Sequence, residues 1–191
     1  KFPLTTWLDN CDFLVNLPKF KTHNFTLLTA AIKNLFGLVS GTFKTELHKN
    51  YFEDKAFAGM LVDILKETTP ALTVVDGIVA MEGDGPATGG RLRQANLLLA
   101  SADCVALDSV LALIMGIEPH AVLTTKEASA RNLGVSDINS IKILGEPLDK
   151  VIGKPFLLPT SAALKKVPLP IINMGKNLLK LYPYVDHNKC I

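Results

Sequence analysis

The alternation of apolar and polar residues predicts two buried strands in the first half of the chain. Residues 13–17 are apolar on both alternating faces except at Asn16, and residues 71–75 follow a similar pattern. Such runs are typical of strands with helices on both faces of the sheet. Pro18 cannot donate to a sheet ladder, so the first strand is predicted to end there. The second is predicted to end at Asp76.

Helical periodicity predicts the elements between and after these strands. An apolar stripe predicts a helix over about residues 25–38, with Thr22 or Asn24 as N-cap. Further helices are expected over about 53–67, 104–115 and 124–133, and further strands over 96–100 and 141–144. This order predicts an α/β fold with a mixed or mainly parallel sheet flanked by helices.

The character of the chain changes near residue 147. Residues 1–146 fit one α/β domain, which we expect to be incomplete at its N-terminus. Residues 147–191 contain six of the eleven prolines and predict an arm or linker, with at most one helix over about 171–181.

Composition excludes several function classes. The chain has 191 residues and 48% hydrophobic content, which is enough for a core. A net charge of +2 is too mild to indicate a nucleic-acid partner. Charged residues interrupt every long apolar segment, so we expect no membrane partner. Three widely spaced cysteines favour a reducing, cytoplasmic location.

Basic residues gather before the predicted helix at 25–38. Lys19, Lys21 and His23 follow one another at every second position, so they share one face of an extended chain. A helix N-terminus adds unpaired N–H groups and partial positive charge. This combination favours an anion, either an outside phosphate or carboxylate or the protein's own acidic side chains. Polar residues farther along could join the site or be simply solvated: Lys33, Asn34, Lys44 and His48.

Acidic residues suggest a second kind of chemistry. Asp76 follows a predicted strand, and Glu82 and Asp84 lie in a predicted glycine-rich loop. The three could hold a divalent cation or transfer protons, although they match no specific metal motif and a solvated turn is the alternative. Asp108 lies within an apolar helix, so it needs a cationic or N–H partner, for instance Lys33 or an arginine. Such a pair could be structural or catalytic.

Four sequence blocks together resemble a known family. They are N-L-P-K-F-K-T-H, A-I-K-N-L-F-G, V-V-D-G-I-V-A-M-E-G-D-G-P-A-T-G-G and L-A-S-A-D-C-V-A-L-D. In this order they are similar to the bacterial and archaeal domain-of-unknown-function family 362, whose members are often described as iron–sulfur cluster-binding proteins. The resemblance covers about residues 12–145 and corresponds to the second half of the family domain. Its motif residues carry over as Lys19, Lys21, His23, Lys33, Asn34, Lys44, His48, Asp76, Glu82, Asp84 and Asp108.

The resemblance also implies a cofactor. In that family a ferredoxin-like segment with C-x-x-C-x-x-C spacing commonly follows the domain, and D-H-N-K-C-I looks like its lead-in. Cys190 would be the first ligand of a 4Fe-4S cluster in a longer chain, because one thiolate cannot hold a cluster.

Three hypotheses for the function remain open. The first is part of an iron–sulfur oxidoreductase or electron-transfer protein, in which the basic residues bind a small anionic ligand and the ferredoxin-like segment of the same polypeptide is the partner. His23, His48 or Asp76 would then carry protons. The second is a non-catalytic ligand-binding or scaffold domain whose lysines pair with its own acids. The third is metal-dependent phosphoryl transfer, which needs Mg²⁺ on the carboxylates.

Overall fold

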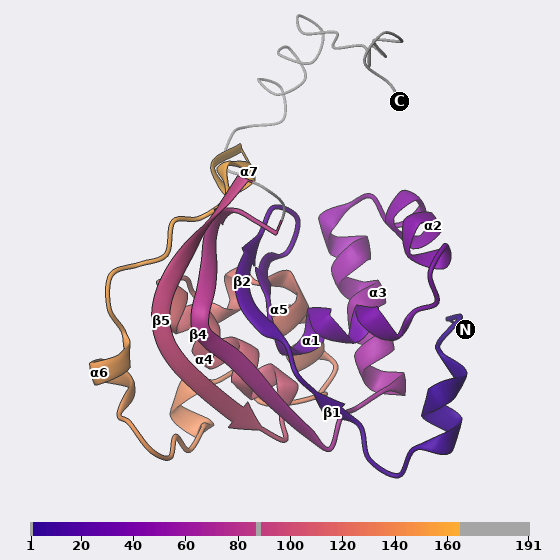
Figure 1. Cartoon of the computed structure of the whole chain (residues 1–191), viewed down its shortest axis with the longest axis horizontal. Helices are drawn as coiled ribbons and strands as arrows, with labels where there is room; N and C mark the ends of the chain where they lie inside the picture. The colour runs from indigo at the N-terminus through magenta and orange to yellow at the C-terminus, as the bar shows by residue number, and fades with distance from the viewer. Residues whose placement is uncertain (1, 87–88, 165–191) are drawn as a thin grey trace, which may run out of the picture.

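A mixed β-sheet packed against a layer of helices forms the core of the protein (Figure 1). The computed structural model describes residues 2–86 and 89–164. The strands described are β1 (Val15–Asn16), β2 (Lys19–His23), β3 (Leu27–Thr29), β4 (Leu72–Asp84) and β5 (Gly89–Ser101). The α-helices described are α1 (Ala31–Asn34), α2 (Phe43–Asn50), α3 (Asp54–Glu67), α4 (Cys104–Met115), α5 (Leu123–Ala130), α6 (Leu148–Val151) and α7 (Thr160–Leu164). Short 3-10 helices are η1 (Thr6–Asn10), η2 (Leu35–Leu38), η3 (Pro119–Ala121) and η4 (Ile138–Ser140).

The long strand β4 lies at the centre of the sheet. On one side, β1 and β2 pair with it in parallel; Val15 lies opposite Leu72 and Lys19 opposite Asp76 in the same register, which then shifts between Lys19 and Lys21. The two short strands therefore lie end to end beside β4, with a break near Pro18. On the other side β5 pairs antiparallel with β4, and β3 pairs antiparallel with β2. The predicted α/β fold with a mixed sheet is confirmed.

The expected glycine-rich loop after Asp76 is wrong. β4 continues through this segment to Asp84 and forms a long hairpin with β5. Local glycine content predicted a turn, but the cross-strand ladder keeps the segment extended. Glycine at position 85 allows the backbone to pass close to Thr22, because a Cβ there would lie 2.8 Å from the backbone oxygen of Thr22. The short strand predicted over 141–144 is also wrong, since these residues are in no strand.

The predicted helix over residues 25–38 begins six residues later than expected. The chain first turns back into β3, and only then forms α1 and η2. The His23 side chain stabilises that turn, because its Nδ1 accepts hydrogen bonds from the backbone N–H groups of Phe25 (3.0 Å) and Thr26 (3.3 Å). Leu28 and Ile32 are both buried, as the apolar pattern predicted. However, Leu28 lies on strand β3 and Ile32 on helix α1, and not on one continuous helix. Burial alone does not distinguish these two geometries.

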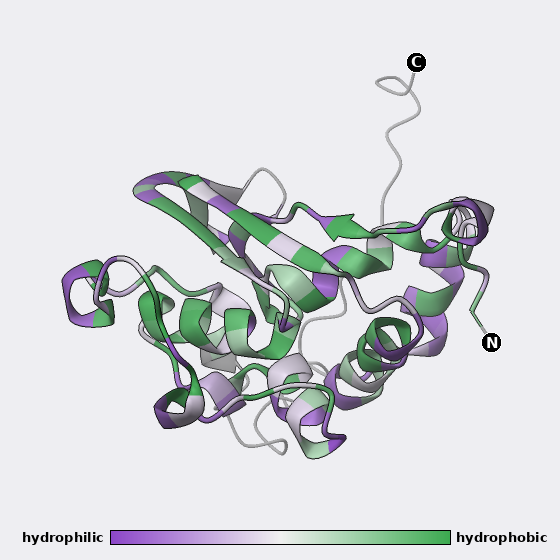
Figure 2. Cartoon of the chain, turned by 90° about the horizontal axis from the view of Figure 1, so that it is seen from below, coloured by the Kyte–Doolittle hydropathy of each residue, from purple (hydrophilic) through white to green (hydrophobic). Residues whose placement is uncertain are grey.

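The helices cover one face of the sheet. Figure 2 shows the sheet as a layer above them, and the buried side chains between the layers include Phe20, Val75, Phe57 and Leu111. On the other face Leu17 and Leu98 are 69% and 68% exposed. The prediction that both faces of the first two strands are covered is therefore wrong within the described residues.

Asp108 on α4 determines where α1 begins. Its carboxylate accepts hydrogen bonds from the backbone N–H groups of Ala31 (2.7 Å) and Ile32 (3.1 Å), which are among the N–H groups that a helix start leaves unpaired. The partner is thus one of the predicted kinds, backbone N–H rather than Lys33 or an arginine. Burial raises the pKa of Asp108 to about 7, although the two hydrogen bonds oppose this shift.

The helix that carries Asp108 has the predicted bounds. Asp103 caps α4 by accepting from the N–H groups of Val105 and Ala106, and Gly116 ends it with φ 81°. The α3 and α5 helices likewise lie close to their predicted ranges.

The substitution Asp108→Ala should lower the free energy of unfolding by about 2–5 kcal/mol, because it leaves two buried N–H groups unpaired and opens a cavity. Chemical denaturation measures this change. Ser109→Ala is the matched control: Ser109 is equally buried on the same helix, but its hydroxyl donates only to Val105 of that helix. Equal losses in the two variants would contradict the role assigned to Asp108.

Candidate functional site

Five of the polar residues selected from the sequence lie around one open hollow beside β2. Its volume is about 210 Å³. The lining residues come from β2, β3, α1, η2, α2 and the β4–β5 turn: Lys21, His23, Thr29, Lys33, Asn34, Phe36, Gly37, Lys44 and Pro86. We call this site the lysine hollow.

The lysine hollow has strong positive character. Three lysines from three different elements line it, Lys21, Lys33 and Lys44, and no aspartate or glutamate does. In the described part of the chain, none of these three ammonium groups forms an ion pair. Burial, with the neighbouring charge of Lys21 as a second cause, lowers the pKa of Lys33 from 10.5 to about 8. Among residues 2–86 and 89–164, the site therefore has no acidic side chain paired with its lysines.

Asn34 connects the hollow to the sheet. Its side-chain amide donates to Asn16 Oδ1 at 2.8 Å, and the amide of Asn16 donates to the carbonyl of Ala31 at 2.9 Å. Asn16 Nδ2 also lies 3.3 Å from the hydroxyl of Thr73 on β4. This chain of polar contacts holds α1 against β1 and β4, so the helix that carries Lys33 is anchored to the sheet through the buried side chains of Asn16 and Thr73.

The two candidate histidines occupy different places. His23 lines the lysine hollow, and since its Nδ1 accepts two backbone hydrogen bonds, the neutral ring carries its proton on Nε2. His48 does not line the hollow. Its Nδ1 lies 2.7 Å from the Lys44 carbonyl, and its ring packs against Phe36 and Phe57 at centroid distances of 5.2 and 4.9 Å.

Lys19 is separated from the other lysines by its own ion pair. Its Nζ lies 2.6 Å from Asp76 Oδ2, and both side chains are about half exposed. The hydrogen bond from Lys19 is the main cause that lowers the pKa of Asp76, and the backbone N–H of Ile78 contributes as well. Thus Lys19 and Asp76, predicted as parts of an anion site and an acid site, neutralise each other outside the lysine hollow.

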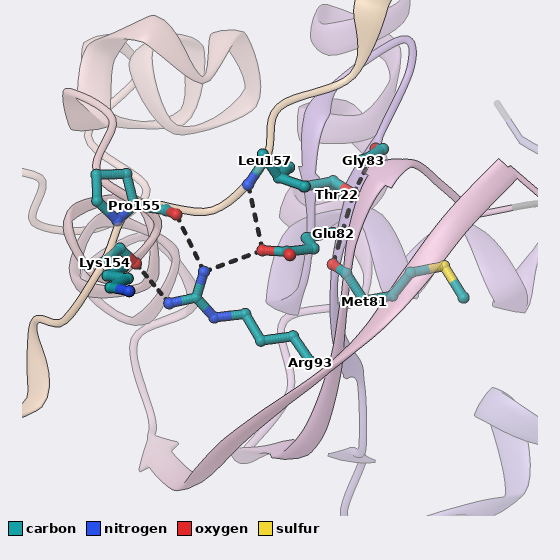
Figure 3. Close-up of polar contacts among 8 residues, drawn as sticks. All are labelled: Thr22, Met81, Glu82, Gly83, Arg93, Lys154, Pro155 and Leu157. Carbon is teal, nitrogen blue, oxygen red and sulfur yellow. Dashed lines mark hydrogen bonds and ion pairs between the residues drawn. The ribbon is translucent and has the colours of Figure 1, made fainter.

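Glu82 and Asp84 fasten a distant segment of the chain to the sheet, and Figure 3 shows the contacts of Glu82. Glu82 forms an ion pair with Arg93 at 2.9 Å and accepts from the N–H of Leu157 at 3.2 Å. Asp84 accepts from the N–H and the hydroxyl of Thr160 at 2.7 and 2.9 Å. Both carboxylates are therefore held by neighbouring residues of the same chain.

Arg93 is the centre of this attachment. Its guanidinium donates to the carbonyls of Lys154 and Pro155, the latter at 3.0 Å, and lies 4.1 Å from the ring centroid of Phe156. Phe156 in turn packs on Phe20, with centroids 4.9 Å apart. The sequence placed Arg93 only before a strand. The sequence signal that could have predicted this role is an arginine on a strand at a position that faces inward.

The three carboxylates predicted as metal ligands do not come together. Within residues 2–86 and 89–164, no three side chains of the metal-binding types form a cluster. Cys104 is buried, as expected of a core residue, and burial raises the pKa of its thiol to about 11. Cys190, predicted as a cluster ligand, and the predicted helix over 171–181 lie outside the described residues.

A family model described as Domain of unknown function (DUF362) matches residues 1–112, which is more than half of the chain. The chain belongs to the DUF362 family. This match extends four residues beyond Asp108, so it includes the hollow-lining residues of this DUF362 chain and the carboxylate that fixes α1.

One curated relative is a thylakoid-associated protein of Synechocystis sp., 39% identical over 128 residues. The alignment covers 66% of this DUF362 chain and 39% of the relative, so the chain spans about two fifths of that protein's length. No solved structure matches the chain. None of the helices described here has both the length and the apolar character needed to cross a membrane.

Removal of the guanidinium in Arg93→Ala should lower the free energy of unfolding by about 2–4 kcal/mol, because Glu82 loses its partner in a partly buried site. It should also speed hydrogen exchange at the N–H groups of Gly83 and Leu157, which pair strand β4 with the attached segment. Arg91→Ala is the control, since Arg91 is exposed two positions away on the same strand. Unchanged exchange at both amides in Arg93→Ala would refute the attachment.

Proposed function

We propose that this DUF362 domain binds a small anion in the lysine hollow, as part of a longer iron–sulfur oxidoreductase or electron-transfer protein. The observation that carries the anion-binding part is the presence of three lysines without an acidic partner around one hollow. Like charges repel one another, and partial burial weakens their hydration. A bound anion removes both penalties.

The same electrostatics appear in the lowered pKa of Lys33. A lysine with this pKa holds its proton less tightly than a solvated one, because neither water nor a carboxylate stabilises its charge. An anion in the hollow reverses this effect and restores the charged form. Ligand binding and proton uptake by Lys33 are therefore linked.

The size of the hollow limits the ligand. Its volume of about 210 Å³ corresponds to roughly seven water molecules at about 30 Å³ each. Such a volume accommodates a phosphate group or a small carboxylic acid. Asn34 and His23 also line the hollow and add polar side chains to the lysines.

The redox part of the proposal has a different support. It rests on the resemblance of the segment around Cys190 to a ferredoxin lead-in. In this proposal the domain holds an anionic substrate or cofactor near a 4Fe-4S cluster that other cysteines of the longer chain complete.

A scaffold function is the second candidate, and the ion pairs outside the hollow favour it. Lys19 with Asp76 and Arg93 with Glu82 are basic and acidic residues that neutralise each other within the protein. If all polar groups of the domain served the fold in this way, the lysine hollow would bind no ligand. Binding measurements distinguish the two candidates directly.

Isothermal titration calorimetry with inorganic phosphate tests anion binding. Lys21→Ala and Lys44→Ala should each weaken affinity about tenfold or more, since a hydrogen bond to a charged group contributes about 1.5–3 kcal/mol. Lys126→Ala, an exposed lysine on α5, should leave affinity unchanged. Equal effects of all three substitutions, or no heat of binding at low salt, would exclude the lysine hollow as an anion site.

The dependence of affinity on pH provides a separate prediction. Sulfate is the better probe here, because its charge stays constant near neutral pH. Below pH 8 Lys33 is protonated before sulfate binds, whereas above pH 8 binding must first take up a proton. Affinity should therefore fall by up to about tenfold per pH unit above pH 8. A flat profile from pH 7 to 10 would contradict this linkage.

The redox part predicts that the longer natural chain, reconstituted anaerobically with iron and sulfide, gains visible charge-transfer absorbance. Replacing Cys190 with Ser should reduce this absorbance and the bound iron, because serine replaces a thiolate ligand. An apoprotein that stays colourless after reconstitution would remove the redox half and leave anion binding in place.

A further inference from the structure

We propose that Lys33 is a nucleophilic amine, and that it forms an imine with a small carbonyl compound carrying a carboxylate or phosphate group. This inference rests on the proposed anion binding in the lysine hollow. It adds a covalent step to that site and names the chemical class of the substrate, which neither family membership nor the relative supplies.

The position of Lys33 supports the assignment. It lies on α1, and Lys21 from β2 and Lys44 from α2 line the same hollow. Within the described part of the chain its ammonium forms no hydrogen bond or ion pair, and its Nζ lies over the Phe36 ring at 6.0 Å from the ring centroid. That distance is at the outer limit for a cation–π interaction, so the ring stabilises the charged form little.

A lysine reacts with a carbonyl only in its unprotonated form. With a pKa of about 8, roughly a fifth of Lys33 is unprotonated at pH 7.4, compared with about a thousandth of an ordinary lysine. Partial burial and a neighbouring cation are the usual means by which proteins prepare such an amine. Both causes act on Lys33.

The remaining lysines determine what kind of carbonyl compound fits. An anion in contact with Lys33 itself favours its charged form, so in this reaction Lys21 and Lys44 bind the anionic group of the molecule, while Lys33 gives up its proton and attacks the carbonyl carbon. The hollow is small, so the carbonyl carbon and the anionic group must be only a few bonds apart. Short 2-oxo acids and three-carbon sugar phosphates have this arrangement.

The reaction balances without any redox partner. Lys33 Nζ adds to the carbonyl carbon, a C–N bond forms and the carbonyl oxygen becomes a hydroxyl. The hydroxyl then leaves as water with a proton from the medium, while nitrogen loses its remaining protons to the medium and the C=N bond closes. The sum is an amine plus a carbonyl giving an imine plus water.

Borohydride trapping tests the proposal on the full chain. The protein is incubated with pyruvate, dihydroxyacetone phosphate or uncharged acetone, reduced with sodium cyanoborohydride, and analysed by intact mass and peptide mapping. We expect one adduct per chain on the peptide that contains Lys33, at least tenfold more with a charged compound than with acetone. The pyruvate and phosphate arms show which anionic group the site prefers. Excess inorganic phosphate should suppress the adduct.

Two variants complete the experiment. Lys33→Arg keeps the positive charge but should abolish the adduct, and Lys126→Arg should retain it in full. Phosphate titration and thermal unfolding of Lys33→Arg verify that the variant is folded, and Lys33→Met serves in its place if the arginine does not fit. Label spread over many lysines, persistence of the adduct in Lys33→Arg or equal labelling by acetone would overturn the proposal.

This test separates the inference from the proposed function. Phosphate binding without an adduct at Lys33 would refute the imine and leave anion binding standing. Absence of both phosphate binding and adduct would refute the two together.

Discussion

The hydrogen bonds from the start of α1 to Asp108 are the interaction on which the site depends. A buried carboxylate is costly, and here two backbone N–H groups at a helix start compensate for that cost. The contact fixes α1 relative to α4, and the Asn34–Asn16 contact fixes it relative to the sheet. Lys33, between these two anchors on one helical turn, therefore has a defined position. The positive end of the helix is satisfied internally and does not contribute to the hollow.

The charged residues of the domain fall into two groups. Lys19, Asp76, Glu82 and Arg93 have partners of opposite charge, and Asp84 is held by Thr160. They connect strands to each other or fasten residues 154–160 to β4. The lysines of the hollow have no such partner among the described residues. Four of the acidic and basic residues selected from the sequence are thus neutralised by each other, whereas three lysines gather around one hollow and concentrate positive charge there.

Much of this arrangement could be predicted from the sequence, and the failures have physical reasons. The predicted range of α4 was correct, because the capping residues at its ends, Asp103 and Gly116, are local signals. Lys21, His23, Lys33, Asn34 and Lys44 were selected together and lie together. The strand β3 was missed because His23 stabilises a turn through its own side chain, which apolar periodicity does not report. The partners of Lys19 and Glu82 were missed because pairing between β-strands and contacts with residues 154–157 are set by tertiary structure.

The position of Asp108 late in the sequence also has a consequence for the folding of the chain during its synthesis. Asp108 follows Ala31 by 77 residues, so a ribosome must synthesise β4, the hairpin and the start of α4 before α1 can receive its partner. Until then the lysine-bearing turn has only local contacts, and short helices are unstable by themselves. The hollow is therefore assembled late in biosynthesis, and it is complete only after the central strand and its hairpin have left the exit tunnel.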